Sequence, residues 1–178
     1  FRRPLQAEET DAYLAIFRTG SARDAFRGGI RLVLTGMLQS PRFLYRVEQS
    51  PRVAVGPAKL NGFELAARLS YLVTASTPDP LLLDAAASGT LDTDQGLQDQ
   101  ATRLLDSPAG AAALGAFHGE WLKLSGLGEI EKDATLFPSF DATKAALAAE
   151  TEHFVSYVLG QADGRFATLL TAPYSVID

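Results

Sequence analysis

Residues 21–39, SARDAFRGGIRLVLTGMLQ, contain the pattern that decides the fold class. Their large apolar side chains recur every three or four positions, which is the spacing of one face of an α-helix. Ser21 is a favourable N-cap residue, and Gly20 can end a preceding helix because glycine readily takes a positive φ. The sequence therefore predicts two helices, over residues 7–19 and 22–39. The second should bury a stripe of side chains, namely Phe26, Ile30, Val33, Leu34, Met37 and Leu38.

The same start and stop signals recur along the rest of the chain. Ser40-Pro41, Thr77-Pro78-Asp79 and Ser107-Pro108 each combine a capping side chain with a proline suited to the first helical turn, and Gly89 is a stop signal. Further helices are expected from Pro41 and over residues 61–75, 80–88, 92–105, 108–124, 141–159 and 165–171. No heptad persists. We predict an all-α protein, an irregular or orthogonal bundle of about eight helices with short capped loops.

Two segments of this pattern carry further expectations. In the helix over residues 108–124, we expect Leu114, Phe117, Trp121 and Leu122 to be buried. The linker over residues 49–58 contains Val53-Ala54-Val55, a run long enough only for a weak edge strand.

Composition places the chain among ordinary globular proteins. Its 178 residues are 47% hydrophobic and 21% charged, which is enough to form a core and too polar for a membrane span. No stretch approaches the roughly 20 apolar residues that a spanning helix needs. The absence of cysteine excludes disulfides, thiolate chemistry, iron–sulfur clusters and covalently attached c-type haem within the chain. We expect no cofactor.

Charge is divided unevenly between the two parts of the chain. Residues 1–52 carry nine arginines against five acidic side chains, whereas residues 53–178 carry seven basic and sixteen acidic ones. The basic side chains include Arg23, Arg27, Arg31, Arg42 and Arg46. They alternate with apolar residues at helical spacing, so a solvated helix face, or pairing with the acidic remainder, is the interpretation we favour. With a net charge of −5 the sequence predicts no nucleic-acid partner.

The segment Glu150-Thr151-Glu152-His153 offers the sharpest candidate for metal chemistry. Glu150 and His153 have the Glu-x-x-His spacing that carboxylate-bridged di-iron bundles place on one helix face. Such sites need two of these pairs and two more carboxylates, whereas the other histidine, His118, has Gly115 three residues before it. We favour a surface helix over a metal site made of Glu150, His153 and His118.

Candidates for catalysis are few. Paired acids for glycoside hydrolysis would be Glu64 and Glu150, two acidic residues on otherwise apolar helices. Arg68 stands four residues after Glu64, so an intrahelical ion pair is the simpler explanation of Glu64. The nucleophile motif Gly-x-Ser-x-Gly, a phosphate loop and zinc-ligand spacing are all absent from the sequence.

Aromatic residues offer one further possibility. A carbohydrate-binding platform would draw on Trp121, Phe137, Phe140 and Tyr174. Buried anchors for the long loop before residue 141 are the interpretation we favour for these rings.

Several motifs, in order, resemble those of two adjoining domain-of-unknown-function families, numbered 1595 and 1592. They are FRRPL (1–5), GI (29–30), LQSPRFLYR (38–46), ELAARLSY (64–71), PD (78–79), GTL (89–91), WL (121–122), FPSF (137–140) and ET (150–151). The first family would cover residues 1–48 and the second residues 59–178, packed as one domain. The resemblance implies a slice of a large exported bacterial protein, often with a cytochrome c-like module.

The leading hypothesis is a non-catalytic helical scaffold or docking module of such an exported, extracytoplasmic multidomain protein. Its partners would be other domains of the parent, a carbohydrate or a redox protein, and faces bared by truncation would favour self-association. One alternative is part of the active-site wall of a polymer-degrading or redox enzyme, with Glu64, Arg68 and Glu150 as candidates. Another is a carbohydrate-binding module. The residues themselves identify no catalytic set.

Overall fold

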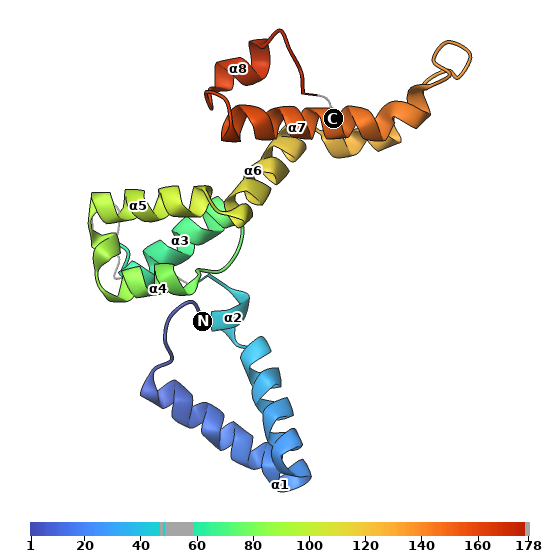
Figure 1. Cartoon of the computed structure of the whole chain (residues 1–178). Coiled ribbons are helices and arrows are strands. Elements are labelled where there is room, and N and C mark those ends of the chain that lie inside the picture. The colour runs from blue at the N-terminus through green and yellow to red at the C-terminus, as the bar shows by residue number, and fades with distance from the viewer. Residues whose placement is uncertain (47, 49–58, 177–178) are drawn as a thin grey trace. The chain divides into compact units, whose positions relative to one another are not determined.

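The computed structural model describes residues 1–46, 48 and 59–176, and throughout these ranges regular structure is helical (Figure 1). The all-α prediction is confirmed. The elements are α1 (Ala7–Leu38), α2 (Pro41–Leu44), α3 (Gly62–Thr74), α4 (Pro80–Ala87), the 3-10 helix η1 (Thr90–Asp92), α5 (Asp94–Leu105), α6 (Pro108–Trp121), the 3-10 helix η2 (Leu124–Glu129), α7 (Phe140–Gly160) and α8 (Phe166–Thr171). The edge strand expected at residues 53–55 lies outside the described residues.

Helix starts follow the capping signals closely. Three helices begin with a capping side chain followed by proline, as predicted. The caps are Ser40, Asp79 and Ser107, which accept hydrogen bonds from the backbone N–H groups of Arg42, Leu82 and Gly110 at 3.3, 2.8 and 3.1 Å. Gly89 has a φ of 77° and follows α4, so its predicted role as a stop is also confirmed. These local signals determine where α2, α4 and α6 begin.

The expected break at Gly20 is wrong. The chain remains helical through Gly20 and Ser21 and reverses at Asp24 and Ala25, where Ala25 has a φ of 42°. Gly20 is buried, and a methyl group there would overlap the carbonyl group of Gly28 on the returning arm. Its small size therefore permits close contact between two arms, a role that local sequence does not distinguish from helix termination.

Ser21 does not cap a helix either. Its Oγ is buried, with no hydrogen-bond partner among the described residues. The two arms of α1, residues 7–23 and 26–38, form a helical hairpin (Figure 1). Gly36 on the second arm faces Ile16 and Tyr13 on the first, so at this level of the hairpin a small residue lies opposite two large ones.

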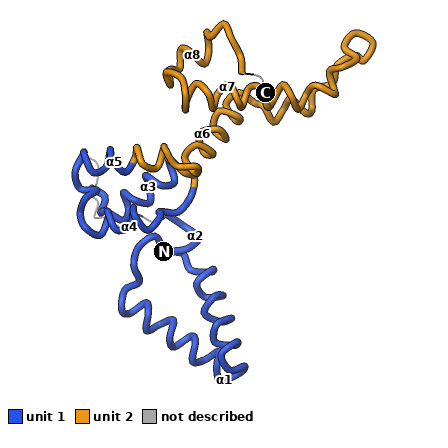
Figure 2. The backbone as a smooth tube through the Cα atoms, viewed as in Figure 1, with its two compact units in different colours: residues 1–72, 76–100 blue, residues 73–75, 101–178 orange. Residues whose placement is uncertain are grey.

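Contacts divide the chain into two compact units (Figure 2). The first unit comprises residues 1–72 and 76–100, and the second comprises residues 73–75 and 101–178. The bounds of these units differ from those of the two segments defined by the sequence motifs, residues 1–48 and 59–178. In the first unit, Leu82 and Leu91 are almost fully buried, and Gly62 lies against the backbone of Ala86.

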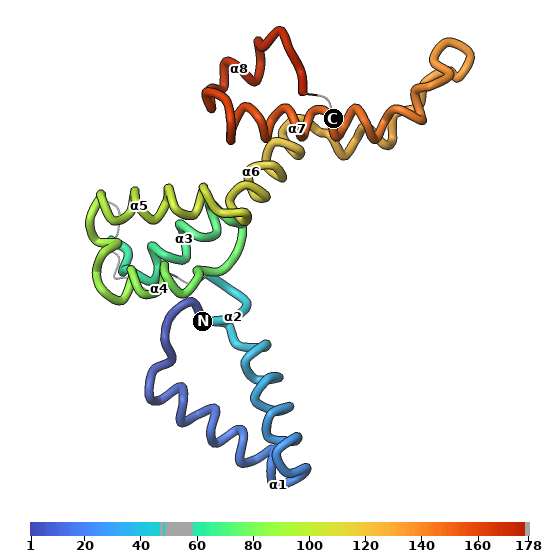
Figure 3. Tube along the Cα trace, viewed as in Figure 1, coloured from blue at the N-terminus to red at the C-terminus, as the bar shows by residue number. Residues whose placement is uncertain are grey.

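The second unit is built around α7, which packs against α6, η2 and α8 (Figure 3). Its buried apolar side chains include Val155 and Val158 on one face of α7, and Leu104 near the end of α5. The burial expected for Phe117 and Trp121 on α6, and for Leu122 directly after it, is wrong, because their exposed fractions are 61%, 44% and 39%. Among the described residues, no helix combines the length and hydropathy needed to cross a membrane.

Candidate functional site

Arg2 joins the N-terminal segment to two helices of the first unit. Its Nη1 donates to the carbonyl oxygens of Arg42 and Tyr45 at 3.0 and 3.2 Å, and its Nη2 donates to that of Phe43 at 3.2 Å. Its Nε donates to the Tyr71 hydroxyl at 3.1 Å. The carbonyls at the end of a helix lack partners within the helix, so one guanidinium satisfies the end of α2 and links it to α3.

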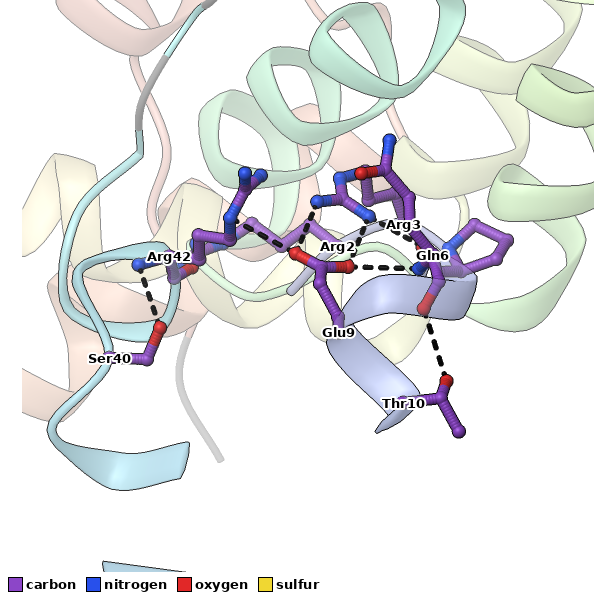
Figure 4. A network of polar contacts seen from close by, with 8 residues as sticks. Arg2, Arg3, Gln6, Glu9, Thr10, Ser40 and Arg42 are labelled. Atoms are coloured by element: carbon purple, nitrogen blue, oxygen red, sulfur yellow. Dashed lines mark hydrogen bonds and ion pairs between the residues drawn. The ribbon is translucent and has the colours of Figure 1, made fainter. Parts of the chain in front are cut away.

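A second polar group lies beside it, centred on Glu9 (Figure 4). Arg3 donates two hydrogen bonds to the Glu9 carboxylate, at 2.8 and 2.9 Å, and Arg42 Nε lies 3.1 Å from the same carboxylate. Glu9 also accepts from the backbone N–H of Gln6, which closes a capping box at the start of α1. The hydrogen bonds from Arg3 and then from Gln6 hold the pKa of Glu9 at about 2. Glu9 is therefore an anion at neutral pH.

These groups form part of the wall of a pocket of about 780 Å³ within the first unit. Its lining includes five arginines, Arg2, Arg3, Arg42, Arg46 and Arg68, together with Glu48 and Glu64. The N-terminal segment, the α2 region and the first half of α3 therefore contribute to one site. We call it the arginine pocket.

Arg68 and Glu64, two of the predicted catalytic candidates, both line the arginine pocket. Arg68 donates two hydrogen bonds to Glu48, at 2.5 and 2.9 Å, and these bonds are the main reason why its pKa is raised. Glu64 accepts from the backbone N–H of Asn61 at 3.0 Å and forms the reciprocal capping box of α3 with it. Both side chains therefore contribute to the structure of the pocket wall.

The remaining predicted candidates belong to the second unit. Glu150 and His153 lie on α7, with Glu150 half-buried and His153 exposed. His118 on α6 is buried, with its Nδ1 2.8 Å from the Leu114 carbonyl oxygen. Across the described ranges, no group of three or more His, Cys, Asp or Glu side chains is arranged to hold a metal ion.

An apolar stripe runs along the second arm of α1. Phe26, Ile30, Leu34 and Leu38 follow one another at intervals of four residues, and their exposed fractions are 70%, 39%, 53% and 55%. Side chains four apart share one helix face, so these residues form a continuous surface. The stripe predicted from sequence is present, but its expected burial is wrong. We call this surface the α1 stripe.

Exposed rings also gather in the second unit. Trp121 and Phe166 lie with centroids 5.5 Å apart at an interplanar angle of 36°, and Phe117 is 61% exposed one turn before Trp121. The burial expected for Trp121, Phe137 and Tyr174 is wrong, since all three are exposed. Phe140, in contrast, is half-buried, with Lys132 and Lys144 near its ring.

The sequence reasoning missed Arg2, Arg3 and Tyr71 as parts of one site. The signal was present in the motifs FRRPL, SPRFLYR and LSY, which supply most of the arginine pocket wall and its neighbour Tyr71. What the motifs lack is spatial information, because their residues are separated by up to 69 positions.

Comparison with known proteins gives two family matches. The family described as Protein of unknown function (DUF1592) matches residues 60–178, and the family described as Protein of unknown function (DUF1595) matches residues 1–48. No curated protein and no solved structure matches the chain.

Proposed function

The chain belongs to the family Protein of unknown function (DUF1592), and from this premise we propose that it is a non-catalytic helical docking module within a larger exported protein. The observation that carries the proposal is the α1 stripe. Four large apolar side chains lie in one row on a helix that packs through its opposite, glycine-containing face. A contiguous exposed apolar surface is typical of a protein interaction site.

The charges beside the α1 stripe define its partner. Arg27 and Arg31 lie on the same arm, next to Ile30 and Leu34 in helical projection, and both are exposed. A protein surface that combines apolar side chains with carboxylates would complement this arrangement. We therefore propose that the α1 stripe binds another module of the parent protein, one that presents a helical surface with both acidic and apolar side chains.

The cellular context is part of the same proposal. The family resemblance supports an extracytoplasmic location and a parent chain with several modules. A docking role agrees with the polar contacts of the first unit, where Arg2, Glu9 and Glu64 join or cap helices. The alternative of an active-site wall would use the arginine pocket, where Glu64 and Arg68 meet.

The test compares Ile30→Ser with Leu32→Ser in the full-length parent protein. The two side chains lie on the same arm with exposed fractions of 39% and 40%, but Leu32 lies outside the α1 stripe. A photo-crosslinking residue at position 34 should join this module to an acidic segment of another module. The crosslink should weaken in Ile30→Ser and persist in Leu32→Ser. Equal yields in both variants, or crosslinks only between two copies of this chain, would overturn the assignment.

The exposed rings support a second candidate function, carbohydrate binding by the second unit. Trp121, Phe117 and Phe166 are all exposed, and a sugar ring can stack on the face of an exposed aromatic ring. Trp121 is the only tryptophan in the chain, so its fluorescence reports on this surface alone. Neutral oligosaccharides should shift the emission, and Phe166→Ala should abolish the shift. Unchanged emission at saturating oligosaccharide would contradict this candidate.

A further inference from the structure

The arginine pocket has more positive charge than its own carboxylates neutralise. Five arginines line it, whereas the carboxylates that interact with them among the described residues are Glu9, Glu48 and Glu64. Two positive charges are therefore left over, in a chain whose net charge is −5. The concentration of cations in one cavity of an acidic protein indicates an anionic ligand.

Most of the arginines in the pocket are engaged by the protein. Arg2 donates to three backbone carbonyls and Tyr71, Arg3 donates to Glu9, and Arg68 donates to Glu48. These three guanidiniums hold the pocket wall together. Their positions are set by the fold, independently of any ligand.

Arg42 and Arg46 differ from the other three. Arg42 uses only Nε, toward Glu9, and its two terminal nitrogens have no hydrogen-bond partner among the residues that the structure describes (Figure 4). Its side chain is 40% exposed. The Arg46 guanidinium lies 4.6 Å from the centre of the Tyr71 ring, and within the described ranges it also has no hydrogen-bond partner. Stacking on Tyr71 restricts the orientation of Arg46 and leaves its N–H groups available.

We propose that the arginine pocket binds a small organic carboxylate, which Arg42 and Arg46 recognise. The two terminal nitrogens of an arginine present parallel N–H groups that match the two oxygens of a carboxylate. Phe1, Tyr45 and Phe63 add aromatic surface to the same cavity, which suits a ligand with a carbon skeleton better than a bare inorganic anion. A free carboxylic acid and an acidic sugar residue share this chemistry.

The site is independent of the α1 stripe and of the docking role. None of the four stripe side chains lines the pocket. Variants of Arg42 or Arg46 should therefore leave the crosslinking result at position 34 unchanged, so the two proposals can fail separately.

Calorimetric titration of the whole chain at low ionic strength tests the proposal. The probes are succinate, galacturonate, its neutral counterpart galactose, and inorganic phosphate. We expect a carboxylate to bind and galactose not to bind. Arg42→Gln and Arg46→Gln should each weaken carboxylate binding about tenfold or more, because each removes a charge-assisted hydrogen bond. Arg18→Gln is the matched control. Arg18 is an exposed arginine on α1 outside both the pocket and the α1 stripe, so this variant should bind the carboxylate as the wild type does.

The outcomes separate the two sources of carboxylate. Binding of both succinate and galacturonate supports recognition of the carboxylate alone, and binding of galacturonate only supports an acidic sugar. Phosphate binding as tight as that of the carboxylates, or no binding by any probe, overturns the proposal. Because Arg42→Gln also removes the contact with Glu9, circular dichroism checks its fold, and Arg46→Gln provides a test that avoids this contact. Wild-type affinity in Arg46→Gln would likewise overturn it.

Discussion

Replacement of Gly20 by alanine tests the hairpin of α1 most directly. In an ordinary helix interior, a Gly→Ala change stabilises the protein by about 1 kcal/mol, because alanine loses less backbone entropy on folding. At Gly20, however, the new methyl group would lie 2.8 Å from the carbonyl carbon of Gly28 and 2.9 Å from Cα of Gly29. Both neighbours are backbone atoms, which cannot rotate away. Forced overpacking costs about 1–3 kcal/mol, so the expected net change is a loss of up to about 2 kcal/mol.

Gly36 supplies the matched control on the same helix. A methyl group there would lie 3.6 Å from Ile16 Cδ1, an ordinary van der Waals distance, so Gly36→Ala should stabilise by about 0.5–1 kcal/mol. The free energies of unfolding of the two variants should therefore differ by up to roughly 3 kcal/mol, with melting temperatures several degrees apart. Urea titration followed by circular dichroism measures the difference, and hydrogen exchange assigns it to α1. If Gly20→Ala is as stable as Gly36→Ala, the two arms do not cross at Gly20.

Three further predictions concern the first unit. Ala25 has a φ of 42°, so Ala25→Gly should relieve backbone strain and raise the free energy of unfolding by about 1 kcal/mol. Urea titration measures this change. A decrease in the free energy of unfolding would argue against the turn between the two arms of α1. The Glu9 pKa of about 2 lies below its ordinary value of 4.5, so the stability that Glu9 contributes should be present above pH 4.5 and be lost as the pH falls toward 2. An NMR titration that follows the chemical shift of the Glu9 carboxyl measures this pKa. The Glu9→Gln variant should lack the acid-dependent loss of stability. A titration midpoint near pH 4.5 would contradict the prediction. Arg2→Lys should lower the free energy of unfolding by about 2 kcal/mol, because a lysine ammonium cannot reach the four acceptors that the guanidinium group of Arg2 binds. Hydrogen-exchange protection at the end of α2 should also weaken. Unchanged protection would refute the role of Arg2.

The sequence predicted helix beginnings well because a cap depends on residues a few positions apart. Asp79 and Ser107 each bond to a backbone N–H three residues later, so the whole interaction lies within one short stretch. Gly89 ends its helix for an equally local reason, its positive φ. The sequence therefore contained everything needed to place these boundaries.

Burial and helix continuity were predicted less well because they depend on distant parts of the chain. Gly20 has the appearance of a helix terminator, but its role is determined by Gly28 on the opposite arm. Phe26 and Phe117 belong to apolar faces that periodicity identifies correctly, yet they are 70% and 61% exposed. Periodicity shows that a face is apolar, whereas the residues that cover it come from elsewhere.

The arginine pocket depends both on local interactions and on contacts between distant parts of the chain. Ser40 caps α2 by a local rule and thereby fixes where Arg42 lies, but Glu9, which binds Arg42, is separated from it by thirty-three positions along the chain. The charge count of residues 1–52 showed an excess of arginine. It did not show that four of these arginines would line one cavity together with Arg68, which lies beyond that range. In that cavity, three guanidiniums hold the wall in place, and this leaves Arg42 and Arg46 in fixed surroundings with donors directed at no protein acceptor among the described residues. Donors held in place before a ligand arrives lose less entropy on binding, so the structural arginines strengthen whatever Arg42 and Arg46 bind.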